Sequence, residues 1–133
     1  MDFGKFVISG ILAGIVLFIA MMVFGFIVQA VMPYNAMEFG GMRSVDDPLM
    51  WLFFVSPWIT GFAMALVYPM IKLDGSAAKK GIRFGLMVWV LSIIPSAFIV
   101  FTSMNYPLGF TLDQVFGNFF GLVAAGIIIA KMM

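Results

Sequence analysis

Four long apolar stretches, separated by short polar segments, dominate the pattern along this chain. They cover residues 6–32, 49–71, 84–104 and 112–130. The first three contain no charged side chain, and the last contains only Asp113, at its beginning. About 20 consecutive apolar residues are enough for a helix to cross a bilayer. The pattern therefore predicts four transmembrane helices in a single domain over residues 1–133.

The connections between these stretches are short, which makes successive helices antiparallel neighbours. We therefore predict an all-α polytopic membrane protein, an antiparallel bundle of four transmembrane helices. Pro33 ends the first stretch and Pro48 precedes the second. Thr111 and Gln114 have the spacing of a capping box, which predicts that the fourth helix begins there.

Composition and charge support a membrane protein and indicate its orientation. Apolar residues make up 64% of the chain and charged residues 10%, against about 45–50% and about 25% in soluble domains. Six of the seven basic residues fall on the side that holds both termini and the middle loop: Lys5, Lys72, Lys79, Lys80, Arg83 and Lys131. Positive charge favours the cytoplasmic side. We expect a multi-pass protein of the cytoplasmic membrane with both termini in the cytoplasm and the lipid bilayer as its first partner.

The chain has neither Cys nor His, which excludes thiol catalysis, thiolate metal sites and the usual general base. Its 13 methionines are soft Cu(I) ligands, but their spacing is irregular. We therefore expect no enzyme activity, no metal and no cofactor. The chain has no basic stripe with interleaved aromatics, so nucleic acid is not an expected partner. No ionisable residue lies in the middle of a stretch, as ion-coupled transport would usually require.

Small residues at four-residue spacing allow transmembrane helices to approach closely. Gly10 with Gly14, and the row Gly117, Gly121 and Ala125, have this spacing. The row on the fourth helix is predicted to pack either inside the bundle or against a partner chain. Gly81 and Gly85 have the same spacing, but they straddle the predicted membrane edge, so we expect them to contribute less to helix packing.

Pro57 and Pro95 lie inside the second and third stretches, where a missing N–H tends to kink a helix. Both lie at a similar depth below the outer edge, so two kinks would open a space there. The hypothesis is a small cavity capped by Asp113 and lined by polar side chains: Gln29, Ser56, Thr60, Ser92, Ser96 and Asn118. It would hold a lipid, a quinone head group or a small solute. The alternative is that these polar groups bond only their own backbone.

The segment 33–48 is the longest connection and carries Glu38, Arg43, Asp46 and Asp47. Gly40 and Gly41 give it a flexible point. Three interpretations remain open: a surface that docks a partner, a lid over the end of the bundle, and a plain solvated connection.

The run from Gly4 to Gly14, the basic segment Ala78-Lys79-Lys80-Gly81-Ile82-Arg83-Phe84-Gly85 and a last helix beginning near Asp113 form a recognisable layout. This layout resembles the small four-helix integral membrane proteins of bacteria and archaea whose domain has no assigned function. The resemblance implies the architecture and no activity or site residue.

Two hypotheses for function follow. The first is a non-enzymatic structural or accessory role, in which the chain packs against itself as a homo-oligomer or joins a larger membrane complex. The alternative is a binder or transporter of a small apolar or weakly polar ligand in the outer cavity. A closed bundle with an exposed glycine face would favour the first hypothesis, and an opening that reaches Asn118 would favour the second.

Overall fold

The computed structural model describes residues 2–35, 44 and 46–133. Within this part of the chain there is no strand. Four helical regions are long and apolar enough to cross a membrane: Phe3–Val31, Met50–Met70, Ala77–Ser103 and Leu108–Met132. The prediction of an all-helical chain with four such regions is confirmed.

Only the first region is a single uninterrupted helix, α1 (Phe3–Val31). The second joins the 3-10 segment η2 (Met50–Val55), α2 (Ser56–Val67) and the 3-10 turn η3 (Tyr68–Met70). The third joins α3 (Ala77–Val88), the π-helical turn η4 (Trp89–Ile93) and α4 (Ile94–Ser103). The fourth joins α5 (Leu108–Leu112), the π-helical turn η5 (Asp113–Gly117) and α6 (Asn118–Met132).

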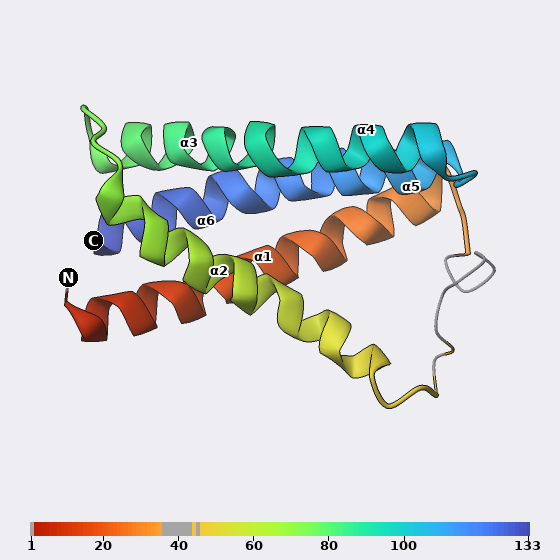
Figure 1. The fold of residues 1–133 in the computed structure, drawn as a ribbon, viewed down its shortest axis with the longest axis horizontal. Helices are drawn as coiled ribbons and strands as arrows, with labels where there is room; N and C mark the ends of the chain where they lie inside the picture. The colour runs from red at the N-terminus through yellow and green to blue at the C-terminus, as the bar shows by residue number, and fades with distance from the viewer. Residues whose placement is uncertain (1, 36–43, 45) are drawn as a thin grey trace.

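Figure 1 shows both termini and the turn between η3 and α3 at one end of the molecule. The start of α5 and the yellow segment η2 lie toward the other end. The main packing partners of α6 are α1 and α3, whereas α2 packs mainly on α1 and crosses it. We call the part around the buried residues Met64, Tyr68, Phe84 and Ile129 the termini half, and the part with η2, α5 and η5 the cavity half.

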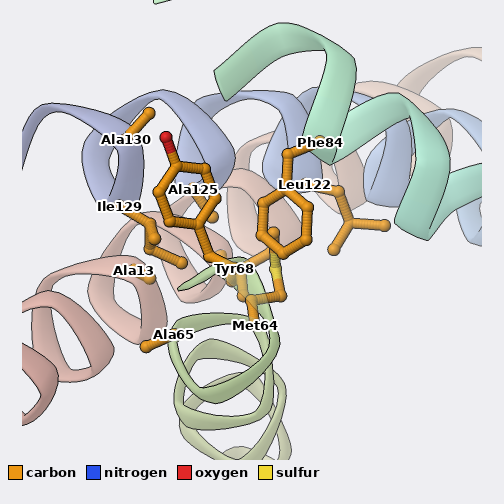
Figure 2. Packing of buried hydrophobic residues seen from close by; sticks show 10 residues of the cluster. Ala13, Met64, Ala65, Tyr68, Phe84, Leu122, Ala125, Ile129 and Ala130 are labelled. Atoms are coloured by element: carbon orange, nitrogen blue, oxygen red, sulfur yellow. The ribbon is translucent and has the colours of Figure 1, made fainter. Parts of the chain in front are cut away.

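The hydrophobic core lies in the termini half (Figure 2). The ring of Tyr68, at the end of the second helical region, meets the ring of Phe84 edge to face, with centroids 5.2 Å apart. Phe84, Leu122 and Ile129 are almost completely buried. Side chains from all four helical regions therefore close this half of the bundle.

Glycines bring the helices of the termini half into backbone contact. A Cβ on Gly61 of α2 would lie 2.7 Å from the carbonyl oxygen of Gly10 and 2.8 Å from the nitrogen of Gly14. On α3, a Cβ on Gly85 would lie 2.5 Å from the carbonyl oxygen of Leu122. Such distances leave no room for a side chain, so these crossings require glycine.

The expectation that Gly81 and Gly85 contribute little to packing is wrong. Both are buried, and Gly81 meets Gly126 of α6 so closely that neither position could carry a Cβ. The reason is that α3 begins at Ala77, before the apolar stretch, and already runs beside α6 there. The closest packing of α3 therefore includes residues that polarity alone places at the membrane edge.

The row Gly117, Gly121 and Ala125 lies inside the chain and faces α1 or the core. A Cβ on Gly121 would lie 3.1 Å from the Leu17 side chain, and one on Gly117 would lie 3.3 Å from Phe24. Ala125 is fully buried. These small residues are therefore used to pack the chain against itself.

Three helical regions begin earlier than the apolar stretches predict: the first by three residues, the third by seven and the fourth by four. Ser76 is the N-cap of α3, and its Oγ accepts a hydrogen bond from the Lys79 nitrogen at 3.3 Å. The fourth region begins at Leu108 after Pro107, so the prediction of a capping box at Thr111 and Gln114 is wrong. An apolar stretch indicates the part of a helix that suits a membrane interior. The helix itself can continue into polar residues if its end is capped.

Each proline that was predicted to kink a helix lies where the helix changes type. Pro57 stands in the first turn of α2, directly after the 3-10 segment η2. Pro95 stands in the first turn of α4, directly after η4, where the Ile94 N–H bonds the carbonyl of Trp89 five residues back. Proline is accommodated in a first helical turn because its missing N–H is not needed there.

Candidate functional site

A cavity of about 510 Å³ lies in the cavity half, bounded by η2 and α2 on one side and by α5 and η5 on the other. Residues of α1 line it between these two walls. Its apolar lining consists of Leu17, Met21, Met50, Phe53, Phe54, Pro57 and Phe110. Its remaining lining consists of Tyr34, Ser56, Thr60, Asp113, Gln114, Gly117 and Asn118.

The cavity exists because the second helical region diverges from its neighbours on the side of Gly61 that leads back to η2. Figure 1 shows the beginning of the second helical region pointing away from α5 and α6. The 3-10 segment η2 presents large side chains there, and Phe53 and Phe54 remain about half exposed. Aromatic side chains and a divergent helix thus leave a space larger than the pocket of about 230 Å³ that lies in the termini half beside Tyr68 and Met133.

A tyrosine–carboxylate pair lies at the edge of the cavity. The Tyr34 hydroxyl donates a hydrogen bond of 2.9 Å to Oδ2 of Asp113. Gly117 makes room for this carboxylate, because a Cβ there would lie 3.2 Å from Oδ1, whereas a Cβ on Gly25 would lie 4.0 Å from Oδ2, at ordinary contact distance. The pair therefore links the segment after α1 to the π-helical turn η5.

Further contacts also hold Tyr34. Its backbone nitrogen donates to Oε1 of Gln29 at 3.1 Å, and its ring meets the ring of Phe110 edge to face at 5.8 Å. Burial raises the pKa of the Tyr34 hydroxyl, and the hydrogen bond to Asp113 and the carboxylate charge raise it further. Tyr34 therefore stays a hydrogen-bond donor well above neutral pH.

The π-helical turn η5 carries several of the cavity's polar groups. Its Val115 carbonyl accepts the indole N–H of Trp89 at 2.8 Å, which joins η5 to η4. The side-chain amide of Asn118 donates to the Gln114 carbonyl at 2.6 Å. Oε1 of Gln114 is buried and has no hydrogen-bond partner within the described ranges, and the same holds for Oγ1 of Thr111. Single π-helical turns occur frequently at functional sites.

The structure brings together only some of the predicted site residues. Ser56, Thr60 and Asn118 line the cavity with Asp113. Ser92 and Ser96 are exposed on the third helical region, outside this lining, and their hydroxyls donate to the carbonyls of Val88 and Ser92. Gln29 is also exposed and reaches the site only through Tyr34.

Asp113 lies deeper than the sequence indicates. Because α5 precedes it, this carboxylate falls inside the fourth candidate span instead of in its first turn. The expectation that no ionisable residue lies in the middle of a span is not contradicted, because Asp113 is still near the beginning of Leu108–Met132. The sequence predicted Asp113 as the cap of the cavity, and the structure places it in the cavity lining.

The aromatic and methionine side chains that form most of the cavity wall were not predicted from the sequence. Nothing in a run such as Met50-Trp51-Leu52-Phe53-Phe54 separates a cavity wall from a lipid-facing surface. Gln114 was interpreted only as a capping residue. The one usable signal was the coincidence of Pro57 with hydroxyl residues at neighbouring positions.

The hypotheses for the segment 33–48 depend mainly on Glu38, Gly40, Gly41 and Arg43, which lie outside the described residues. Among the residues that are described, no three His, Cys, Asp or Glu side chains gather as metal ligands would. No protein-family model, curated protein or solved structure matches the chain.

Proposed function

We propose that the chain is a multi-pass membrane protein with an antiparallel arrangement of its four spans and both termini in the cytoplasm. Four long apolar helical regions and the gathering of six of seven basic residues toward the termini support this orientation. The cavity half then faces the outer side of the membrane. A molecule in the outer leaflet would reach the cavity between α2 and α5.

We propose that the protein acts without catalysis, as a binder or transporter of a small, largely apolar molecule in the cavity. The observation that carries this proposal is a cavity of about 510 Å³ with a mainly apolar lining and a few convergent polar groups. Ligand pockets typically occupy about 300–1,000 Å³ and have this composition. The opening reaches Asn118, which is the arrangement expected for binding.

The structural or accessory role is our second proposal, and it has less support. Its main sequence feature was the glycine face of the fourth helix, and Gly117 and Gly121 are occupied by contacts with α1. The large exposed apolar side chains fit lipid contact as well as a partner helix. The same experiment separates the two proposals.

The experiment compares the wild type with Thr60→Phe and Ile59→Phe, each extracted gently from membranes and measured by native mass spectrometry. Thr60 lines the cavity, whereas its neighbour Ile59 is 66% exposed and is not part of the lining. We expect the wild type and Ile59→Phe to retain a small molecule that Thr60→Phe loses. A bare chain in all three would refute ligand binding, and the same larger assembly in all three would favour the accessory role.

A further inference from the structure

The polar groups of the cavity differ in what they can still offer a ligand. The Ser56 hydroxyl donates to the Phe53 carbonyl at 2.8 Å, and the Thr60 hydroxyl donates to the Ser56 carbonyl at 3.2 Å. One amide hydrogen of Asn118 is used by the Gln114 carbonyl. These hydroxyl donors are therefore already engaged with their own helices.

The cavity has an excess of free acceptors. A carboxylate offers about four lone-pair positions, and Asp113 receives one hydrogen bond, from Tyr34. Oε1 of Gln114, the next residue, is buried and accepts no hydrogen bond from any described residue. Such an unused acceptor is costly unless a donor reaches it. The occupant that fits would therefore bring hydrogen-bond donors.

The formal charge of the cavity lining is negative. Asp113 is its only formally charged residue, and no Lys or Arg is part of the lining that the structure describes. Phe53, Phe54 and Phe110 supply aromatic rings to the same space. Aromatic faces attract cations, and a carboxylate in a partly desolvated site attracts them more strongly.

We propose, building on the ligand-binding function above, that the ligand is an amphiphile with an ammonium-type head group. The head lies beside the Asp113 carboxylate and donates hydrogen bonds to it and to Oε1 of Gln114. The apolar body lies against Met50, Phe53 and Phe54. Tyr34 is a positioning residue, because its hydroxyl fixes one carboxylate oxygen and leaves the other free.

Three probes with the same body and different heads test this proposal: 4-phenylbutylamine, 4-phenylbutanol and 4-phenylbutyrate. The full chain, labelled with ¹³C at its methionine methyl groups, is placed in phosphatidylcholine nanodiscs at neutral pH. The Met21 and Met50 methyl groups report on the cavity, and Met70, which is 74% exposed and outside the lining, reports on partitioning into lipid. Titration of these NMR signals gives an affinity for each probe.

We expect the amine to bind about tenfold or more tightly than the alcohol, because charge-assisted hydrogen bonds are about twice as strong as neutral ones, and the butyrate to bind most weakly. Asp113→Asn should bring the amine and the alcohol to similar affinities. Tyr34→Phe should keep the preference for the amine, because the carboxylate remains.

Each failure has a different meaning. Equal binding of amine and alcohol by the wild type, with both lost in Thr60→Phe, refutes the ammonium head and leaves the binding function. If no probe moves the Met21 and Met50 signals beyond the shift at Met70, the binding function fails as well. The comparison of three heads on the unmodified chain remains decisive even if Asp113→Asn does not fold.

Discussion

The two halves of this bundle are built from the same four helical regions, yet they pack differently. The termini half has a tightly packed core and a pocket of about 230 Å³ at its end, whereas the cavity half holds a cavity of about 510 Å³. In the termini half, Gly10, Gly14 and Gly61 bring α1 and α2 together, and Gly85 does the same for α3 against α6. In the cavity half, η2 presents Phe53 and Phe54 to the cavity, and the fourth helical region changes to π-helical geometry at η5.

The difference shows that backbone approach decides whether a small membrane bundle closes. Lipid gives little hydrophobic drive for helix association, so close contact over small residues supplies much of the stability. Where both partners at a crossing are glycines, the backbones touch. Around the cavity, where Met50, Phe53 and Phe54 stand between the helical regions, a space remains that is available to a ligand.

The largest expected effect comes from adding one methyl group to each half. Gly85→Ala would place a Cβ 2.5 Å from the Leu122 carbonyl oxygen, so α3 and α6 must separate, at a cost of about 3 kcal/mol in the free energy of unfolding. Gly25→Ala is the matched change in the cavity half, where the nearest atom is Oδ2 of Asp113 at 4.0 Å. It should leave stability unchanged or raise it by up to about 1 kcal/mol through helix propensity.

Both variants are measured by reversible unfolding in mixed detergent micelles, followed by circular dichroism. Equal stability losses for Gly85→Ala and Gly25→Ala would contradict the distinction between the tightly packed termini half and the cavity half. Ala78→Leu, at an exposed position of α3, controls for added bulk outside the crossing.

The next prediction concerns the Tyr34–Asp113 pair, which links the segment after α1 to η5. Tyr34→Phe removes the hydrogen bond to Asp113 and should cost about 1 to 2 kcal/mol at neutral pH. The folded-state pKa of Tyr34 is raised above its ordinary value of 10.0. Its contribution to stability is therefore present below pH 10.0 and declines as the pH rises from there toward the folded-state pKa.

The free energy of unfolding of the wild type should thus approach that of Tyr34→Phe as the pH is raised above 10.0. Raising the pH also acts on the rest of the chain, so the measured quantity is the difference between the two proteins. A difference that stays constant between pH 8 and pH 11 would show that the hydroxyl of Tyr34 does not contribute in this way.

A smaller effect is expected at the bond between the two π-helical turns. Trp89→Phe removes the indole N–H that the Val115 carbonyl accepts at 2.8 Å, while a ring remains to pack on Phe119. The expected loss is about 1 kcal/mol in the free energy of unfolding. Trp51→Phe is the control, since Trp51 is 62% exposed. Equal losses in the two variants would remove any special role for the Trp89 bond.

More of the fold than of the candidate site could be predicted from the sequence. Charge-free stretches located all four helical regions, because burying charge in a membrane interior is costly. They missed the helix starts at Ala77 and Leu108, because a cap and not apolarity determines where a helix begins. The depth of Asp113 and the role of Gly81 depend on those starts, so both were misjudged.

Which residues line the cavity depends on how each helix is rotated about its axis, and an apolar stretch does not indicate that rotation. All six polar candidates were chosen by depth along their helices, and depth was a fair guide for Thr60 and Asn118. Ser92 and Ser96 have a similar depth but lie outside the cavity lining. When nearly every side chain on a helix is apolar, the hydrophobic pattern has no polar face from which rotation can be read.

The smallest expected effect is at these two serines, and it sharpens the boundary of the site. Ser92→Ala with Ser96→Ala removes hydroxyls that are exposed and bonded only to carbonyls of their own helix. Such changes usually alter stability by less than about 0.5 kcal/mol, and we expect the amine probe to keep its wild-type affinity. Ser56→Ala with Thr60→Ala removes two hydroxyls of the same type that do line the cavity. If only the Ser56 and Thr60 variant binds the amine more weakly, the polar edge of the site lies on α2. If the Ser92 and Ser96 variant also binds it more weakly, the site extends to the third helical region, and the boundary between the two halves must be changed.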